Sequence, residues 1–311
     1  MEKLTNLKIV FLGTPEFAVA SLDALLNANM NVVGVVTAPD KPAGRGLKIT
    51  ESAVKKFAVE KGLKILQPEK LKNTEFLEEL KSLNADVQVV VAFRMLPEAV
   101  WNMPPLGTIN LHASLLPNYR GAAPINWAII NGEKETGVTT FKLQHEIDTG
   151  NILLQEKISI GEEDTAGELH DTMKDIGGNL LVKTIQGLQD GTLKEISQQS
   201  LQSDESRFRH APKIFTETAN IDWSKSVDDI HNLIRGLSPY PGAFTDFNGK
   251  MMKIFRSTRE ITTPTIKTGE FETDKKAYLK FAASDGYISV QELQLEGKKR
   301  MRVEEFLRGM R

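Results

Sequence analysis

The sequence predicts an α/β protein with a Rossmann-like, doubly wound, mostly parallel sheet, followed by a small C-terminal antiparallel β-barrel of the OB-like kind. Three observations predict this fold class. Over the first two-thirds of the chain, short β-rich runs alternate with helical patterns. Several of these runs are almost continuously β-branched, which is typical of strands covered on both faces. After about residue 190 the alternation stops and strand patterns dominate.

The first part of the chain supplies the predicted parallel sheet. Strand patterns lie at residues 8–12, 32–37, 86–92, 108–112 and 138–143. Helical patterns lie between or after them at residues 15–27, 51–61, 74–83 and 122–130. The near-continuous valine run at 87–91 indicates a strand that is buried on both sides. We therefore expect a sheet that carries helices on both faces.

The last third of the chain has a different organisation. A helical pattern at 166–188 ends at Asp190-Gly191, and the polar stretch after it is typical of a linker. A short amphipathic helix is predicted at 227–236. Strand patterns follow at 243–247, 251–256, 276–282 and 288–295, with hairpin turns at Asn248-Gly249 and Asp285-Gly286. These patterns predict a first domain at 1–190, a linker at 191–206 and a β-barrel domain at 207–311.

The composition excludes several classes of protein. The 311 residues are 40% hydrophobic and 26% charged, as in an ordinary globular protein. The chain has no cysteine, which excludes disulfides, thiolate zinc sites and a cysteine nucleophile. Its five histidines show no metal-ligand spacing, so we expect no metal site. There is no signal-peptide pattern and no apolar run near the roughly 20 residues that cross a bilayer, so we expect a cytoplasmic protein.

The net charge of −2 is unevenly distributed along the chain. Residues 207–311 hold 19 Lys and Arg against 14 Asp and Glu, a balance of +5. Residues 1–206 hold 20 against 27, a balance of −7. A basic tail on an acidic body is compatible with a polyanionic partner such as nucleic acid, although modest imbalances of this size are common.

The polar residues around the strand at 108–112 form the candidate active site. Asn110 and His112 are two apart in a strand, so both side chains point to the same face. At the carboxyl end of a parallel strand this pair lies over the crevice where α/β proteins bind ligands. The polar loop at 114–120 follows directly. Asp148 stands in a turn after a later strand, where it is equally a turn former and a carboxylate that could orient His112.

Two further segments are candidates for ligand binding. Gly13 follows the first strand, but the G-x-G-x-x-G pattern is absent, which disfavours an NAD-dependent oxidoreductase. The loop at 39–48 (PDKPAGRGLK) carries Lys41, Arg45 and Lys48. It is either a solvated surface loop or a basic segment that binds a phosphate or an RNA end.

Together these motifs resemble the folate-dependent formyltransferases. The resemblance is carried by Asn110-x-His112-x-Ser114-Leu-Leu-Pro117, Tyr119-Arg-Gly121 and Asp148-Thr-Gly150. It implies a Rossmann-like domain, 10-formyltetrahydrofolate as the formyl donor, and catalysis by Asn110, His112 and Asp148. It also implies folate contacts at Ser114, Leu115, Leu116 and Pro117. The sequence departs from many members at residues 92–97 (AFRMLP), where Arg94 replaces a glycine.

Other segments resemble the members that formylate methionyl-tRNA for translation initiation. They lie at residues 13–17, 41–48, 121–124, 221–223 and 235–241, so the resemblance covers nearly the whole chain. It implies that tRNA is bound by Lys41, Arg45 and Lys48 and by the basic domain at 207–311. We expect the protein to act as a monomer.

The resemblance implies acyl transfer to an amine. Asn110 and His112 are then expected to donate hydrogen bonds to the oxyanion, while Asp148 holds His112 in its donor form and helps to move the proton. One alternative is a formyltransferase for a small amine such as an amino-sugar nucleotide, and the basic segments favour tRNA over it. Another is a non-catalytic nucleic-acid-binding protein, which would not require this grouping of side chains.

Overall fold

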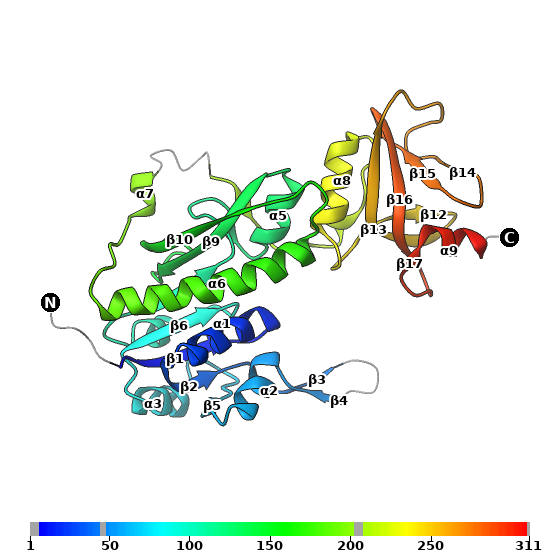
Figure 1. Cartoon of the computed structure of the whole chain (residues 1–311). Coiled ribbons are helices and arrows are strands. Elements are labelled where there is room, and N and C mark those ends of the chain that lie inside the picture. The colour runs from blue at the N-terminus through cyan, green and yellow to red at the C-terminus, as the bar shows by residue number, and fades with distance from the viewer. Residues whose placement is uncertain (1–5, 44–47, 202–207, 310–311) are drawn as a thin grey trace. The chain divides into compact units, whose positions relative to one another are not determined.

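The computed structural model describes residues 6–43, 48–201 and 208–309 (Figure 1). Its largest sheet has seven strands in the order β10-β9-β7-β6-β1-β2-β5. The parallel part comprises β1 (Lys8–Gly13), β2 (Asn31–Val36), β5 (Ile65–Leu66), β6 (Val87–Val91) and β7 (Thr108–His112). β9 (Glu135–Lys142) pairs antiparallel with β7, and β10 (Ile152–Ser159) lies next to β9. The predicted α/β fold with a mostly parallel sheet is confirmed.

Helices pack on one face of this sheet through an apolar cluster. α3 (Thr74–Ser82) and α4 (Glu98–Trp101) contribute Phe76, Leu80 and Val100, which join Val10 and Val90 of the central strands. The strand residues in this cluster alternate with residues that point to the opposite face. The positions of these strand residues therefore show which side chains of the neighbouring strand β7 lie on the same face of the sheet as the cluster.

The opposite face is covered by the long helix α6 (Ala166–Gln189), together with α1 (Glu16–Asn27). Gly177 of α6 approaches the side chain of Leu111 so closely that an added Cβ would lie 2.9 Å from it. Gly178 comes equally close to α1, since its Cβ would lie 3.1 Å from that of Ala24. Small residues at these positions let α6 lie against both the sheet and α1.

The remaining elements of the first two-thirds are short. They are the hairpin strands β3 (Lys41–Ala43) and β4 (Lys48–Thr50), the helices α2 (Ala53–Glu60), α5 (Pro124–Ile130) and α7 (Gln198–Leu201), and the paired strands β8 (Arg120–Gly121) and β11 (His210–Ala211). Helix α2 begins directly after Ser52, since serine is a preferred N-cap residue and its hydroxyl accepts a hydrogen bond from the Lys55 amide at 3.0 Å.

The C-terminal part forms an antiparallel half-barrel, which agrees with the prediction of a small antiparallel β domain. Its strands are β12 (Ala243–Phe247), β13 (Lys250–Ile261), β14 (Phe271–Thr273), β15 (Leu279–Ala282), β16 (Gly286–Leu295) and β17 (Met301–Arg302). The other elements are the 3-10 helix η2 (Glu217–Ala219), α8 (Val227–Gly236) and α9 (Val303–Arg308). The Trp223 ring stacks on Phe281 at 4.6 Å in the core of this part.

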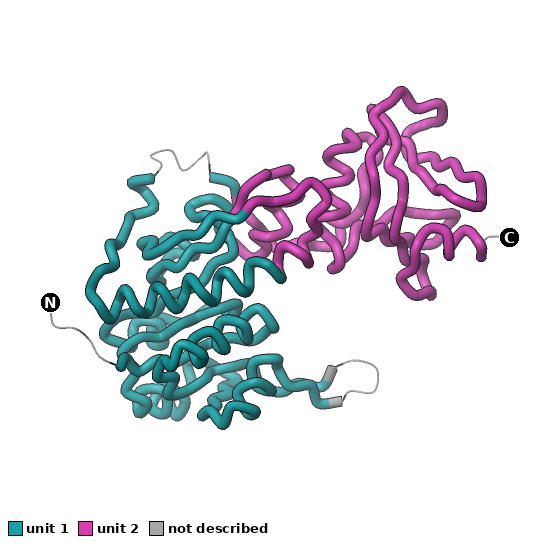
Figure 2. Tube along the Cα trace, in the orientation of Figure 1, with its two compact units in different colours: residues 1–120, 137–158, 171–209 teal, residues 121–136, 159–170, 210–311 magenta. Residues whose placement is uncertain are grey.

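The chain divides into two compact units that do not follow a single cut in the sequence (Figure 2). Unit 1 contains residues 1–120, 137–158 and 171–209, and unit 2 contains 121–136, 159–170 and 210–311. The candidate catalytic residues belong to unit 1 and the half-barrel to unit 2. Of the predicted linker at 191–206, residues 202–206 lie outside the described residues. No helix within the described ranges is both long and apolar enough to cross a membrane.

Candidate active site

The strand β7 carries Asn110 and His112 at its carboxyl end. Residues two apart in a strand share a face, and Asn110 is in register with Val90 of β6. Both side chains therefore lie on the face that α3 and α4 cover. His112 is 7% exposed, whereas Asn110 is half-buried. The structure brings these two residues together in the way that their spacing predicts.

The two ring nitrogens of His112 have different partners. Nε2 lies 2.8 Å from the carbonyl oxygen of Tyr119. Because a carbonyl oxygen only accepts hydrogen bonds, Nε2 must be the donor. Nδ1 lies 3.9 Å from Oδ2 of Asp148. The Tyr119 carbonyl thus fixes the N–H on Nε2, and Nδ1 is the ring nitrogen that faces Asp148.

Asp148 is held beside His112 by an unusual turn. It is 9% exposed and has a φ of 56°, in the left-handed region that non-glycine residues seldom adopt. The next residue, Thr149, donates from Oγ1 to the Glu146 carbonyl at 3.1 Å. Gly150 lies so close to β9 that an added Cβ would be 1.6 Å from the Lys142 carbonyl oxygen. Only glycine allows the turn to approach β9 this closely.

Side chains on β9 and β10 hold the loop after β7 by hydrogen bonds to the loop backbone. Thr139 on β9 donates from Oγ1 to the Ser114 carbonyl at 2.6 Å and accepts from the Leu116 amide at 3.2 Å. Gln155 on β10 donates to the Leu116 carbonyl at 2.9 Å. Of the four residues that the resemblance assigns to folate, Ser114, Leu116 and Pro117 are buried and Leu115 is half-buried. The structure places all four directly beside the end of β7.

One segment near the site has no sequence pattern that indicates a role there. Residues 195–198 of the predicted linker lie along the strand that follows the Asp148 turn, through an antiparallel bridge between Ile152 and Ile196. The Glu195 carboxylate accepts from Asn151 at 3.0 Å and pairs with Lys142 at 2.5 Å. These two contacts hold the pKa of Glu195 below its usual range. Gln198, 2% exposed, completes the segment.

Two of the three predicted tRNA-binding residues, Lys41 and Lys48, belong to the hairpin β3–β4, which projects away from the sheet (Figure 1). Lys41 is exposed on β3, Lys48 begins β4, and Arg45 lies outside the described residues. The base of the hairpin is anchored by Asp40, which pairs with Lys55 and accepts from Gln67 at 2.8 Å. The hydrogen bonds from Lys55 and Gln67 lower the pKa of the Asp40 carboxyl.

Arg94 shows how the chain accommodates its departure from the family pattern. Its guanidinium donates to the backbone carbonyls of Glu69, at 2.9 Å, and Pro68. A cavity of about 700 Å³ beside it is lined mainly by apolar residues, among them Met95 and Leu96. Arg94 thus ties the loop after β6 to the segment after β5.

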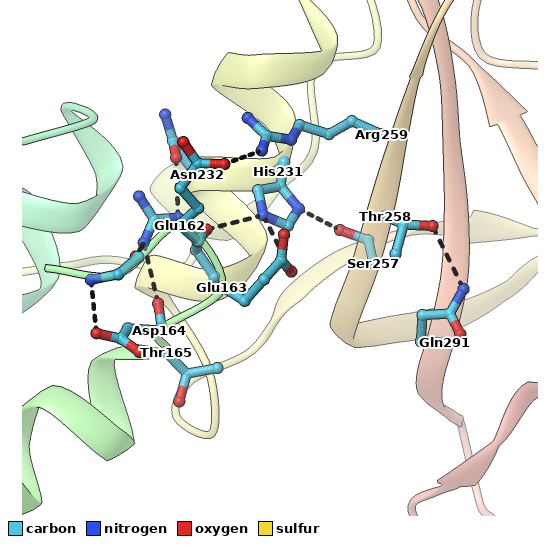
Figure 3. A network of polar contacts seen from close by, with 12 residues as sticks. Glu162, Glu163, Asp164, Thr165, His231, Asn232, Ser257, Thr258, Arg259 and Gln291 are labelled. Atoms are coloured by element: carbon cyan, nitrogen blue, oxygen red, sulfur yellow. Dashed lines mark hydrogen bonds and ion pairs between the residues drawn. The ribbon is translucent and has the colours of Figure 1, made fainter. Parts of the chain in front are cut away.

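Unit 2 contains a separate polar network around His231 (Figure 3). The ring nitrogen Nε2 donates to the Glu162 carbonyl at 3.4 Å and lies 3.7 Å from the Glu163 carboxylate. Nδ1 therefore accepts from the Ser257 hydroxyl, at 3.1 Å. Burial lowers the pKa of His231. Within the described part of the chain, no three His, Asp or Glu side chains gather as metal ligands would.

Comparison with known families identifies the class of protein. Residues 7–185 match the family model described as "Formyl transferase", and residues 213–311 match "Formyl transferase, C-terminal domain". The first match alone covers more than half of the 311 residues. The α/β fold and these matches define an enzyme that transfers a one-carbon group. The chain belongs to the formyl transferase family.

Individual relatives agree with this assignment. Proteins named methionyl-tRNA formyltransferase from Phocaeicola vulgatus and Bacteroides thetaiotaomicron are 54% and 51% identical to the chain. The alignments cover 100% and 99% of this chain and 98% and 97% of the relatives. An N-formyltransferase from Helicobacter canadensis, solved with folinic acid and dTDP-3-aminofucose, shares the fold at a TM-score of 0.68. It is 23% identical, and the match covers 95% of this chain and 100% of that one.

Proposed function

We propose that this enzyme transfers the formyl group of 10-formyltetrahydrofolate to the α-amino group of methionyl-tRNA, producing formylmethionyl-tRNA for translation initiation. The observation that carries the proposal is the identity of about half of all residues, over nearly the full length, to proteins named methionyl-tRNA formyltransferase. Relatives that act on amino sugars share the fold at much lower identity, so they do not favour a sugar acceptor.

The proposed donor site is the loop after β7. A folate bound there supplies the formyl group. Ser114, Leu115, Leu116 and Pro117 are the residues that the resemblance assigns to it. The backbone of Leu116 is engaged by Thr139 and Gln155, so this loop is fixed before any ligand binds. A preformed loop reduces the ordering that ligand binding would otherwise require.

In the proposed mechanism, Asn110 and the His112–Asp148 pair have separate roles. The Asn110 amide donates a hydrogen bond to the oxygen on which negative charge develops. The attacking amine must be neutral, which its usual pKa of about 7.7–8.0 permits near neutral pH. His112 Nδ1 faces Asp148 and accepts the proton that the amine releases. The resulting imidazolium has one N–H for the Tyr119 carbonyl and one for Asp148. When the bond between the formyl carbon and N10 breaks, the imidazolium returns its proton to N10 of the departing tetrahydrofolate.

The proposed tRNA contacts are electrostatic. Lys41, Arg45 and Lys48 belong to the segment between residues 39 and 48, and the balance of +5 in residues 207–311 supplies further positive charge. Contacts with phosphates release counterions, so the affinity for tRNA is expected to fall as salt rises. We further propose that the enzyme works as a monomer in the cytoplasm.

The reaction can be tested by choice of acceptor. Purified protein is incubated with 10-formyltetrahydrofolate and either methionyl-tRNA, free methionine or a dTDP-amino sugar. We expect formylation of methionyl-tRNA alone. Formylation of the amino sugar alone would overturn the proposed acceptor while leaving the donor in place. No formylated product with any acceptor would overturn the proposed reaction.

A further inference from the structure

Gln198 is a buried side chain that connects the two segments around the candidate catalytic pair. Its Nε2 donates to the backbone carbonyls of Asp148 and Gly150, both at 2.8 Å. Its Oε1 accepts from Nε of Arg120 at 3.1 Å and from Nη2 at 2.7 Å. Both N–H groups and the oxygen of the amide are therefore engaged. Since Gln198 is only 2% exposed, water does not compete for these bonds.

The Asp148 turn requires support of this kind. Asp148 adopts a left-handed φ of 56°, a conformation that persists only where the surroundings stabilise it. The Gln198 amide stabilises both ends of the turn, because it donates hydrogen bonds to the carbonyls on either side of Thr149. The position of the Asp148 carboxylate therefore depends on where Gln198 lies.

The oxygen of the Gln198 amide connects the turn to the surroundings of His112 through Arg120. Arg120 directly follows Tyr119, whose carbonyl accepts the hydrogen bond from His112 Nε2. The Arg120 guanidinium also lies 5.1 Å from the centre of the Phe208 ring. A single side chain thus links the residue after the histidine's partner to the turn that bears the aspartate.

The segment that carries Gln198 is anchored by contacts that do not involve the Gln198 side chain. The backbone of Ile196 pairs with Ile152 through bonds of 2.8 and 2.9 Å, and Glu195 is bound by Asn151 and Lys142. Replacing the Gln198 side chain leaves these contacts in place. The segment should therefore stay where it is when the amide is removed.

We propose that Gln198 is a positioning residue that sets the distance between His112 Nδ1 and the Asp148 carboxylate. It would act through the turn and touch neither substrate. The inference rests on the proposed function, in which this pair takes up the proton from the amine. Displacements of about 1 Å in such a pair can lower a rate by about 10²-fold.

The test uses two substitutions and a matched control. Gln198→Met fills a similar volume without polar atoms, and Gln198→Glu keeps an oxygen for Arg120 but loses both N–H donors. Both are expected to lower kcat by about 10²-fold with KM for both substrates unchanged. Gln199→Ala alters the exposed glutamine beside it on α7 and should match the wild type. Unchanged kcat in Gln198→Glu would overturn the proposal, since the donors would then not position the turn.

A second readout is independent of the reaction. In protein labelled with ¹⁵N-histidine, the ring-nitrogen shifts of His112 report its hydrogen bonds, and the spectrum of His112→Ala assigns them among the five histidines. We expect the Nδ1 signal of His112 to shift in both Gln198 variants and to stay in place in Gln199→Ala. Unshifted signals in folded Gln198 variants would overturn the inference. If the wild-type protein formylates no acceptor while the His112 signals of the Gln198 variants still shift, the proposed function alone is overturned.

Discussion

Gly150→Ala is the substitution whose effect follows most directly from the geometry of the site. The added Cβ would lie 1.6 Å from the Lys142 carbonyl oxygen and 2.8 Å from its carbon. Real Cβ atoms essentially never come within 3.0 Å of such an atom, and here the neighbour is backbone at the end of β9, a strand that lies between β7 and β10. The turn that carries Asp148 must therefore move away from β9 by more than 1 Å.

That displacement has two measurable consequences. Overpacking of a close contact typically lowers the free energy of unfolding by about 1–3 kcal/mol. Moving Asp148 away from His112 should also lower kcat by about 10²-fold, because proton transfer depends on their alignment. Urea unfolding measures the first and steady-state formylation of methionyl-tRNA the second. The reasoning predicts that kcat falls even under conditions where the variant is fully folded.

The control for this prediction is Gly309→Ala. Gly309 follows α9 with a φ of −83°, and its added Cβ would meet the Phe306 carbonyl oxygen at an ordinary 3.4 Å. It should change neither stability nor rate appreciably. A Gly150→Ala protein with wild-type kcat would show that the tight packing of the turn on β9 does not position Asp148.

Three further substitutions test other parts of the proposal. Asn110→Ala should lower kcat by about 10²–10³-fold with little change in folate affinity, measured by kinetics and by folate binding; normal turnover would exclude Asn110 as an oxyanion donor. Lys41→Ala should reduce the slope of log kcat/KM for methionyl-tRNA against log salt by about 0.7–0.9 if it contacts one phosphate, and an unchanged slope would remove that contact. His231→Gln should flatten the dependence of unfolding free energy on pH below about 6.5. Burial lowers the pKa of His231, so between its lowered value and the usual one the unfolded chain binds more protons, and wild-type stability falls as pH falls. Identical pH profiles of stability, measured by urea unfolding, would contradict the last prediction.

The sequence predicts those elements whose burial follows from the local pattern. Strand β7 (Thr108–His112) and helix α8 (Val227–Gly236) have the bounds that were predicted, because each apolar pattern is closed by a clear change in polarity. Strand β13 continues to Ile261, beyond the predicted end at residue 256. Its pairing with β16 shifts register between Ile254 and Ser257, which interrupts the alternation of apolar and polar residues.

Short elements that are held by non-local contacts were not predicted. Strand β5 is two residues long, and no periodicity can be read from two residues. Gln198 lies in a polar stretch that is typical of a linker, yet it is buried by partners 48 to 78 positions away in the sequence. The role of Tyr119 was likewise hidden, because its carbonyl reaches His112 from a residue with a φ of 61°. Asn110 and His112 were placed correctly because a strand relates them locally.

The interleaving of the two units means that the C-terminal half-barrel is not a detachable module. Arg235 on α8 is 3% exposed, and its guanidinium donates to the carbonyls of Gly161 at 3.1 Å and Asp164 at 3.0 Å. Those acceptors precede the half-barrel by some 70 positions in the chain, yet belong to the same unit. A fragment that began at residue 210 would lose the backbone carbonyls to which the Arg235 guanidinium donates its hydrogen bonds. Fusions or gene truncations that borrow this domain should therefore carry residues 121–136 and 159–170 with it.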